Sequence, residues 1–507
     1  MAILMADGFD FYTVIGDAAA QQGSGNLVWD AVSSVAGLTS TTRFSVGQAF
    51  ATTNNAVGQL QKSYGSNEAT VFICCAQYFT AVSLGSSGDG YGWQLFDGTT
   101  AQCTIWFEND GAIRLRAGSS NSGTILATFT GAFSAQTWNQ FQIEATVNST
   151  TGSIHIRKNG NTSDDFSATG LNTQASGNSY SNLIKLTTSG SSTQNFLDDV
   201  LIFSSSGAAP NTWVGDVRAI QMMAASDPAT IDFSPFPTTY GYNSNSTGGN
   251  TDSELANTIY WTAVTSGRDG KITSASVTLA SGFTGHMIAG IYSSGGTNGP
   301  NSLLGTSTAV TNPVTGLNVF NFSTPVSVTN GGTYYVAILA DAAFSIKDST
   351  TLEATAVPTT TGANPYASGF TVTNPDPVNT IRTFKLSFMI TPANHEQINE
   401  LKEDGDTTYI FDSTVGDEDL YGVAAMSSTP ASIIGVIAKM FCRKDATGGR
   451  SIALQFKSGS TEINGTTAVM NTSYGWLTQT QMQDPNTSAP WTETGVNNAL
   501  LGPKIIA

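Results

Sequence analysis

A strict alternation of apolar and polar side chains in residues 137–148 constrains the fold more than any other feature of the chain. In this segment, TWNQFQIEATVN, every second residue from Phe141 to Val147 is apolar and the residues between them are polar. A period of two indicates a β-strand with one buried face. The segment GSIHIRKNG (152–160) repeats the alternation and ends in Asn159-Gly160, a pair typical of a tight hairpin turn. We therefore expect an antiparallel β-sandwich with its core in residues 138–203.

The segment NFLDDVLIF (195–203) is apolar on both sides of the expected strand, which indicates a central position in a sheet. Strict alternation divides its apolar residues into one face with Phe196, Val200 and Ile202 and another with Leu197, Leu201 and Phe203. The adjacent Asp198 and Asp199 then point to opposite faces. At least one of these two carboxylates is buried among apolar neighbours, where it needs a partner.

Arginines on neighbouring strands are the expected partners of this buried acid pair. Arg114 and Arg116 lie on the same face of the strand predicted for AIRLRAG (112–118), and they are the leading candidates. Arg157 and Arg218 are the alternatives. A contact of this kind specifies strand order more than it adds to stability.

The order of these segments resembles the laminin-G-like, or concanavalin A-like, jelly rolls of tailed-phage virion proteins. In that family, a strand with a DD-v motif and a later segment with a GD-v-r motif end the lectin-like domain. Here the two motifs are DDV (198–200) and GDVR (215–218). The resemblance continues in DGDTTYI (404–410) and in the run around Trp491, and it covers about residues 1–225 and 395–507.

The rest of the chain shows the same short, evenly spaced alternations, separated by Gly- and Pro-rich turns. We therefore predict an all-β protein of tandem antiparallel β-sandwiches. The expected domains are a concanavalin A-like jelly roll (1–225), a linker (226–254), an inserted jelly-roll module similar to carbohydrate-binding modules (255–392) and a small C-terminal β-sandwich (396–507).

Charge and hydropathy exclude several classes of partner. The 507 residues carry 20 Lys and Arg against 37 Asp and Glu, a net charge of -17, which disfavours binding to nucleic acid or anionic lipid. No run of 18 or more apolar residues occurs, so we expect no membrane insertion. The start, MAILMADGFDFY, has no basic leader, so we expect synthesis in the host cytoplasm without a signal peptide. The four cysteines have no metal-ligand spacing and are expected to be buried thiols.

Catalytic residues are not expected. Jelly-roll glucanases carry a Glu-x-Asp-x-Glu strand that places carboxylates on one face, and the chain has no such run. The three histidines, His155, His286 and His395, are too scattered for a hydrolytic triad or a zinc site. The acidic run GDEDLYG (416–422) is expected to be a solvated loop.

Ligand-binding candidates are few. We expect no cofactor, with calcium as the alternative, because loop carboxylates at Asp404 and Asp406, or at Asp89 and Asp97, are suitable ligands. Candidate glycan contacts are aromatic residues beside Gly-rich turns, and core packing explains them equally well. These residues are Tyr91, Trp93 and Trp213.

The resemblance implies a non-enzymatic virion protein: a tail fibre or tip, a collar or a capsid decoration. We expect it to bind itself as a homo-oligomer (a trimer is one option), other virion proteins and host cell-surface glycan. The alternatives are a glycan depolymerase carried on the virion and a bacterial surface adhesin.

Overall fold

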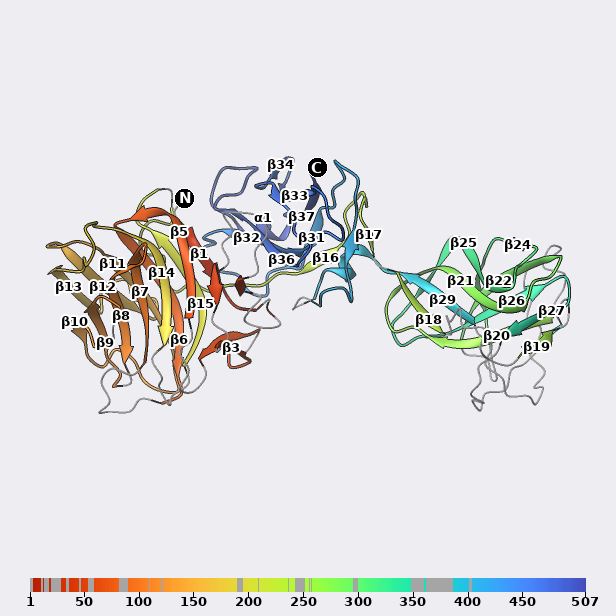
Figure 1. Cartoon of the computed structure of the whole chain (residues 1–507), viewed down its shortest axis with the longest axis horizontal. Helices are drawn as coiled ribbons and strands as arrows, with labels where there is room; N and C mark the ends of the chain where they lie inside the picture. The colour runs from red at the N-terminus through yellow and green to blue at the C-terminus, as the bar shows by residue number, and fades with distance from the viewer. Residues whose placement is uncertain are drawn as a thin grey trace. The chain divides into compact units, whose positions relative to one another are not determined.

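The computed structural model describes most of the chain and divides it into two compact units. The described residues are 3–10, 12, 18–19, 29–32, 36–44, 47–52, 59–81, 90–108, 110–119, 122–188, 195–207, 209–235, 237–241, 251–254, 256, 258–294, 300–347, 360–361, 386–400 and 404–507. Unit 1 comprises residues 1–233, 398–407 and 412–507, and unit 2 comprises residues 234–397 and 408–411. The fold is all-β with antiparallel sheets, as predicted (Figure 1).

The N-terminal part of unit 1 is a sandwich of two antiparallel sheets, drawn from red to yellow in Figure 1. The first sheet has the order β13 (Phe166–Leu171), β12 (Gly152–Lys158), β11 (Trp138–Thr146), β6 (Thr70–Phe79), β15 (Asn195–Ser204), β4 (Ala49–Thr52) and β3 (Ala36–Thr39), with β1 (Ile3–Asp7) beside β15. The second has the order β10 (Ile125–Phe129), β9 (Ile113–Ala117), β8 (Thr100–Glu108), β7 (Gly90–Asp97), β14 (Ser181–Thr188), β5 (Gln59–Glu68) and β2 (Ala31–Val32).

The core of this sandwich lies where the alternation predicts it. Phe141 and Ile143 of β11 are fully buried in a cluster that draws apolar residues from both sheets. Ile154 and Ile156 of β12 join the same cluster. Each sheet therefore presents every second side chain to the other, which is how a sandwich removes apolar surface from water.

The C-terminal part of unit 1 is a smaller sandwich. One sheet has the order β16 (Ala224–Ser226), β31 (Tyr421–Val423), β37 (Leu500–Ile505), β33 (Ser451–Ser458) and β34 (Thr461–Asn464), with β35 (Ala468–Val469) on β33. It packs against the pair β32 (Val436–Cys442) and β36 (Gly475–Gln481) through apolar residues that include Leu454, Phe456 and Leu477. The short helix α1 (Glu493–Asn497) begins after Thr492, whose side chain accepts a hydrogen bond from the backbone N–H of Gly495.

Unit 2 is a third sandwich, drawn from green to cyan in Figure 1. One sheet has the order β18 (Thr238–Gly241), β29 (Leu386–Thr391), β21 (Gly270–Ser281), β27 (Phe344–Lys347) and β19 (Thr251–Glu254), with β25 (Gly316–Val328) on β21. The other has the order β23 (Leu303–Thr306), β22 (His286–Ser293), β26 (Thr333–Ala340), β20 (Thr258–Thr265) and β28 (Thr360–Thr361), with β24 (Val310–Thr311) on β22. The strands β17 (Ser234–Pro235) and β30 (Ile410–Phe411) pair with each other, and a 3₁₀-helix, η2, spans Asn394–Gln397.

Residues of all four predicted segments are distributed over the two units. Most of residues 396–507 share unit 1 with residues 1–233, and within it they form the smaller sandwich. Much of the predicted linker (226–254) is ordered, since it contains β17, β18 and β19. The buried carboxylate of Asp419 accepts backbone N–H groups of Asp232 and Phe233, which fixes this segment despite its prolines. Unit 2 lies between segments of unit 1 along the chain.

A buried ion pair joins the two sandwiches of unit 1. The fully buried side chain of Asp7 accepts hydrogen bonds from Tyr12 Oη at 2.8 Å, Trp29 Nε1 at 3.0 Å and the backbone N–H of Phe9 at 3.0 Å. Lys439 of β32 places its Nζ 3.4 Å from Asp7 Oδ1, with 7% of its side chain exposed. Buried carboxylates require such partners, so this lysine ties the C-terminal strands to the N-terminal sandwich.

We expect Lys439→Met to lower the free energy of unfolding of unit 1 by about 2 kcal/mol, because Asp7 loses its cation but keeps three hydrogen bonds. Urea denaturation followed by tryptophan fluorescence measures this loss. Lys457→Met is the matched control, since Lys457 is over one-third exposed and forms only a surface pair with Glu462 at 3.7 Å. Equal effects of the two substitutions would contradict the role given to the buried pair.

Candidate functional site

The two adjacent acids of the first motif lie on a β-bulge of β15. Asp198 is opposite Ala76 of β6 while Leu201 is opposite Cys74, so β15 carries one more residue than its partner in this interval. The backbone of Asp199 has a φ of 51°, in the left-handed region that non-glycine residues rarely adopt. A bulge inserts one residue into a ladder and shifts the phase of the side chains beyond it.

The bulge overturns the predicted division of β15 into faces. Leu197 packs in the core together with Val200 and Ile202. Phe196 lies on the other side of the sheet, where it stacks on Tyr78 with ring centroids 5.5 Å apart. Strict alternation had placed Phe196 with Val200 and Leu197 with Leu201, and both assignments are wrong because the extra residue reverses the phase. The expected burial of β15 is confirmed along its whole length.

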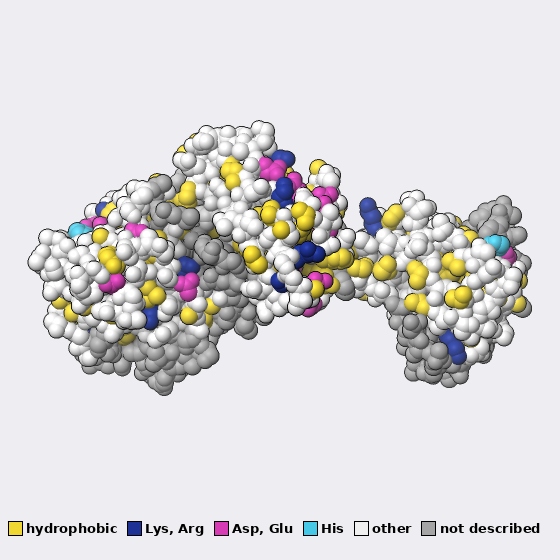
Figure 2. Space-filling model, turned by 45° about the horizontal axis from the view of Figure 1, so that its top comes forward, with side chains coloured by type: hydrophobic (Ala, Val, Ile, Leu, Met, Phe, Trp, Pro, Cys, Tyr) yellow, Lys and Arg dark blue, Asp and Glu magenta, His cyan; other side chains and the backbone are white. Residues whose placement is uncertain are grey.

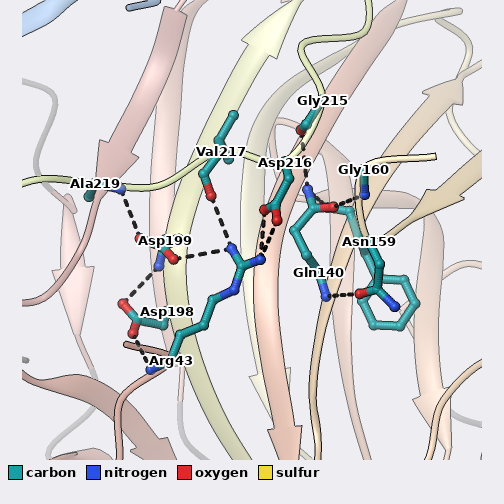
Figure 3. Close-up of polar contacts among 11 residues, drawn as sticks. Arg43, Gln140, Asn159, Gly160, Asp198, Asp199, Gly215, Asp216, Val217 and Ala219 are labelled. Carbon is teal, nitrogen blue, oxygen red and sulfur yellow. Dashed lines mark hydrogen bonds and ion pairs between the residues drawn. The ribbon is translucent and has the colours of Figure 1, made fainter. Parts of the chain in front are cut away.

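Both carboxylates of the pair are buried and both contact Arg43, from the segment between β3 and β4 (Figure 3). Asp198 Oδ2 accepts the backbone N–H of Arg43 at 3.1 Å, and Asp198 Oδ1 accepts the backbone N–H of Asp199 at 2.9 Å. Asp199 Oδ2 lies 3.4 Å from Arg43 Nη1. The prediction that the two side chains point to opposite faces of the sheet is therefore wrong, because the bulge lets both carboxylates contact Arg43.

Arg43 also binds the second motif. Its Nη2 donates to both carboxylate oxygens of Asp216, at 2.7 and 2.6 Å, and its Nη1 donates to the carbonyl of Val217 at 3.1 Å. Asp199 Oδ1 accepts the backbone N–H of Ala219 at 2.8 Å. We call Arg43, Asp198, Asp199 and Asp216 the Arg43 clamp, because together they hold residues 216–219 against the first sheet (Figure 3).

Burial sets the ionisation of the clamp. Desolvation, with the charge of Asp199 as a second cause, raises the pKa of Asp198 to about 8. Desolvation also raises the pKa of Asp199, against the opposing effects of the Ala219 N–H and Arg43. The neighbouring Asp10 has its pKa raised to about 6, again mainly by desolvation. At neutral pH the clamp therefore holds Asp198 largely as a neutral carboxyl group.

Buried amides fix the same segment from the neighbouring strand β11. Gln142 Oε1 accepts the backbone N–H groups of Val214 at 3.0 Å and Gly215 at 2.9 Å. Gln140 Nε2 donates to the carbonyl of Gly215 at 3.4 Å, and its backbone N–H donates to Asn159 Oδ1 at 3.0 Å (Figure 3). These contacts are architectural, because they bind backbone groups.

The predicted arginine partners lie elsewhere. Arg114 and Arg116 of β9 bind Glu108 of β8, whose side chain is fully buried, and Arg114 also binds Asp110 at 2.6 Å. The predicted pairing with Asp198 and Asp199 is wrong, because β9 belongs to the second sheet and β15 to the first.

The alternative partners make other contacts, although the charge of Arg218 also lowers the pKa of Asp199. Arg157 pairs with Asp164 at 2.9 Å, and the guanidinium group of Arg218 lies 4.0 Å from the centre of the Phe44 ring. The partner that the sequence analysis missed is Arg43, which lies about 155 residues before the acid pair in the chain.

The predicted aromatic glycan contacts do not form an exposed platform. Trp93 is 0% and Tyr91 3% exposed, and both belong to the core of the N-terminal sandwich, so their predicted role is wrong. Trp213 is half-buried: it packs edge-on against Phe72, and the guanidinium group of Arg157 lies 4.0 Å from its ring centre.

The candidate calcium ligands are engaged with protein groups. Asp97 Oδ2 accepts hydrogen bonds from Ser176 and Asn178, and Asp406 pairs with Arg443 at 2.8 Å. Asp89 lies outside the described residues. Within the described ranges, no three His, Cys, Asp or Glu side chains gather in a group that could hold a metal ion. Calcium stays a prediction.

A polar pocket of about 440 Å³ lies on the second sheet of the N-terminal sandwich. We call it the amide pocket. It is formed by β5, by β14 and by the turn between β7 and β8, and its lining residues are Ser63, Gly65, Ser66, Asn67, Gly98, Asn182 and Leu183. Asn182 Oδ1 accepts the backbone N–H of Gly98 at 2.9 Å, while Asn182 Nδ2 has only long contacts, 3.4 Å to Asn67 Oδ1 and 3.5 Å to Asp97 Oδ1.

Sequence reasoning missed the amide pocket, because its residues come from three separate segments and none belongs to a recognisable motif. The weak signal was the single glycine of YGSN (64–67) inside a strand, since glycine in a strand often marks a close approach of a ligand or backbone.

Comparisons with known proteins give structural similarities alone. No family model matches the chain, and no curated protein matches it. Among solved structures, the catalytic domain of a glycoside hydrolase family 131 protein from Coprinopsis cinerea is similar at 16% identity and a TM-score of 0.27, covering 43% of this chain and 99% of that one.

Two further solved structures are similar at comparable identity and TM-score. The calcium-bound exoplasmic/lumenal domain of VIP36 has 11% identity and a TM-score of 0.27, over 41% of this chain and 96% of that one. The β-glucanase of Bacillus licheniformis has 12% identity and a TM-score of 0.25, over 40% and 98%. Similarity at this level assigns no function.

Among the helices of the described residues, none has the length and hydrophobicity needed to span a lipid bilayer.

Proposed function

We propose that the chain is a non-enzymatic structural protein of a tailed-phage virion and that its N-terminal sandwich binds host-surface glycan. The observation that carries the proposal is the Arg43 clamp. The acids of the two motifs behind the family resemblance, DDV and GDVR, bind one arginine that lies far before both motifs in the sequence. The motifs therefore have a common architectural purpose, which is to close the lectin-like sandwich.

The state of the buried carboxylates supports binding without turnover. Glycosidases need two carboxyl groups facing one sugar, about 5–5.5 Å apart in retaining and about 6.5–9.5 Å apart in inverting enzymes. Asp198 and Asp199 are 6% and 5% exposed, and backbone N–H groups and Arg43 occupy them. Glu108 on the second sheet is fully buried between two arginines. Carboxylates held in this way are poorly placed to protonate or attack a glycosidic bond.

The surface supports a role in adhesion and assembly. Only 11% of residues are charged, and Figure 2 shows a face on which charged side chains are scattered among uncharged polar groups and backbone. Such a surface suits contacts with the hydroxyl groups of sugars and with further copies of the chain. We propose a homo-oligomer on the virion, in which several weak glycan contacts act together.

Adsorption experiments test this proposal. Peptides of the chain should be recovered by mass spectrometry from purified phage particles, and the purified chain, added to host cells first, should slow phage adsorption severalfold. Incubation with host capsule or lipopolysaccharide should release no new reducing ends, with heat-denatured chain as the control. New reducing ends would establish the competing depolymerase function, and absence from particles would overturn the virion role.

A further inference from the structure

The amide pocket is a candidate binding site for the proposed adhesion to glycan. We propose that it binds an uncharged sugar of the host-surface glycan through Asn182, Asn67 and the surrounding hydroxyl and backbone groups. This inference rests on the proposed function and adds the place and the chemical class of the ligand. The pocket volume of about 440 Å³ is within the range of about 300–1,000 Å³ found for small-molecule sites.

The lining offers hydrogen-bonding capacity that the protein itself uses weakly. Asn182 Nδ2 carries two N–H groups, and its nearest acceptors are at 3.4 and 3.5 Å, longer than an ordinary N–H···O bond. Ser63 Oγ lies 3.5 Å from the Asn182 carbonyl, also a long contact. Because a sugar hydroxyl both donates and accepts, it can pair with an amide, a serine hydroxyl or a bare peptide group.

Glycines open the backbone of the pocket to a ligand. A side chain added at Gly65 or at Gly98 would meet no atom within 4 Å, so both peptide groups border open space. Both residues have a positive φ, 71° and 57°, which glycine adopts without strain. No side chain therefore covers the backbone of Gly65 in β5 or of Gly98 in the turn between β7 and β8.

The segment 175–180, which Asp97 links to the lining residue Asn182, is fixed by hydrogen bonds within the protein. Gln102, fully buried, accepts the backbone N–H groups of Ala175 and Ser176 and donates to the carbonyls of Asn178 and Tyr180 at 2.8 and 2.9 Å. Asp97 adds hydrogen bonds from Ser176 Oγ and Asn178 Nδ2. A site that is already ordered loses less entropy on binding, which favours even a small ligand.

Charge selects the class of sugar. None of the lining side chains is charged, and carboxylates lie beside the lining: Asp97 approaches Asn182 at 3.5 Å, and Asp30 accepts the backbone N–H of Ser63 at 2.5 Å. The buried Glu68 accepts a hydrogen bond from Ser66 at 2.6 Å, which places a third acid behind the lining. With a net charge of -17 on the chain, the field disfavours sialic acids, uronic acids and phosphorylated sugars. The amide pocket therefore fits neutral hexoses and their N-acetylated forms.

Two substitutions test the pocket. Ser63→Trp fills it from the exposed face of β5, and Asn182→Asp keeps the oxygen that binds Gly98 but replaces the donating amine with a second acceptor. Ser167→Trp is the matched control, since Ser167 is exposed on β13 of the other sheet. The probes are printed bacterial polysaccharides, one set neutral and one set carrying uronate or sialic acid. Unchanged unfolding midpoints establish that the variants remain folded.

We expect the full chain to bind neutral polysaccharides, both pocket variants to lose roughly tenfold or more in apparent affinity, and Ser167→Trp to bind normally. Undiminished binding by both pocket variants would overturn the site while leaving the proposed adhesion intact. Binding confined to the acidic set would overturn the neutral class. Wild-type chain that binds none of the polysaccharides would overturn the inference together with the glycan-binding function.

Discussion

Replacing Arg43 with methionine is expected to lower the free energy of unfolding of unit 1 by about 3–5 kcal/mol, the range found when one partner of a buried ion pair is removed. Methionine keeps much of the length of the side chain but leaves Asp199 without its cation and Asp216 without its two hydrogen bonds. Residues 216–219 would also lose the bond from Arg43 to the carbonyl of Val217. Chemical denaturation and amide hydrogen exchange of β15 both measure the loss.

The matched control is Arg218→Met. Arg218 is an exposed arginine of the same region, and its guanidinium group contacts Phe44 from above the ring. A contact of this type at an exposed site contributes about 0.5–1 kcal/mol. If the two methionine variants were equally stable, the clamp would not be what holds the motifs together, and the architectural reading of DDV and GDVR would fail.

The stability of unit 1 is expected to fall as the pH rises from about 5 to about 8. The pKa of Asp198 is raised from 3.8 to about 8 in the folded protein, so in this interval the folded state binds a proton that the unfolded chain has released. The stabilisation from this group is complete below pH 4 and is lost as the pH passes through about 8. One such proton changes the free energy of unfolding by up to about 1.4 kcal/mol per pH unit.

Asp198→Asn should remove most of this pH dependence, because the amide stays neutral at every pH. Denaturation midpoints of the wild type and the variant, compared at intervals from pH 5 to pH 9, measure the slope independently of the absolute stability. Asp445→Asn, at an exposed aspartate, should keep the wild-type slope. A wild-type slope retained in Asp198→Asn would assign the pH dependence to another group, with Asp199 and Asp10 the next to test, since the pKa of each is raised.

Local alternation predicted the strands well. The period of two in residues 141–147 and 154–156 identified β11, β12 and the face that packs in the core. Asn159 and Gly160 have φ values of 49° and 79°, as a tight turn with positive φ at both positions requires. These features depend only on residues that are neighbours in the sequence, so they can be predicted from the sequence alone.

Features that depend on partners distant in sequence were not predictable in the same way. A bulge is a property of two paired strands, and no local signal in NFLDDVLIF distinguishes Asp199 as the extra residue. Arg114 and Arg116 were plausible partners because they lie on the same face of their strand. The buried Glu108 of the adjacent strand is closer along the hairpin, and it forms ion pairs with both arginines. The amide pocket needs three segments brought together, and each contributes ordinary polar residues.

The pairing of β17 with β30 has a consequence for how this protein can change. Ser234 lies opposite Phe411 and Pro235 opposite Ile410, so the points where the chain begins and completes the inserted sandwich are neighbours. Closely spaced ends are the arrangement in which one domain is inserted into another at small cost. Recombination can therefore exchange this sandwich as a single segment and leave the strands of unit 1 unchanged.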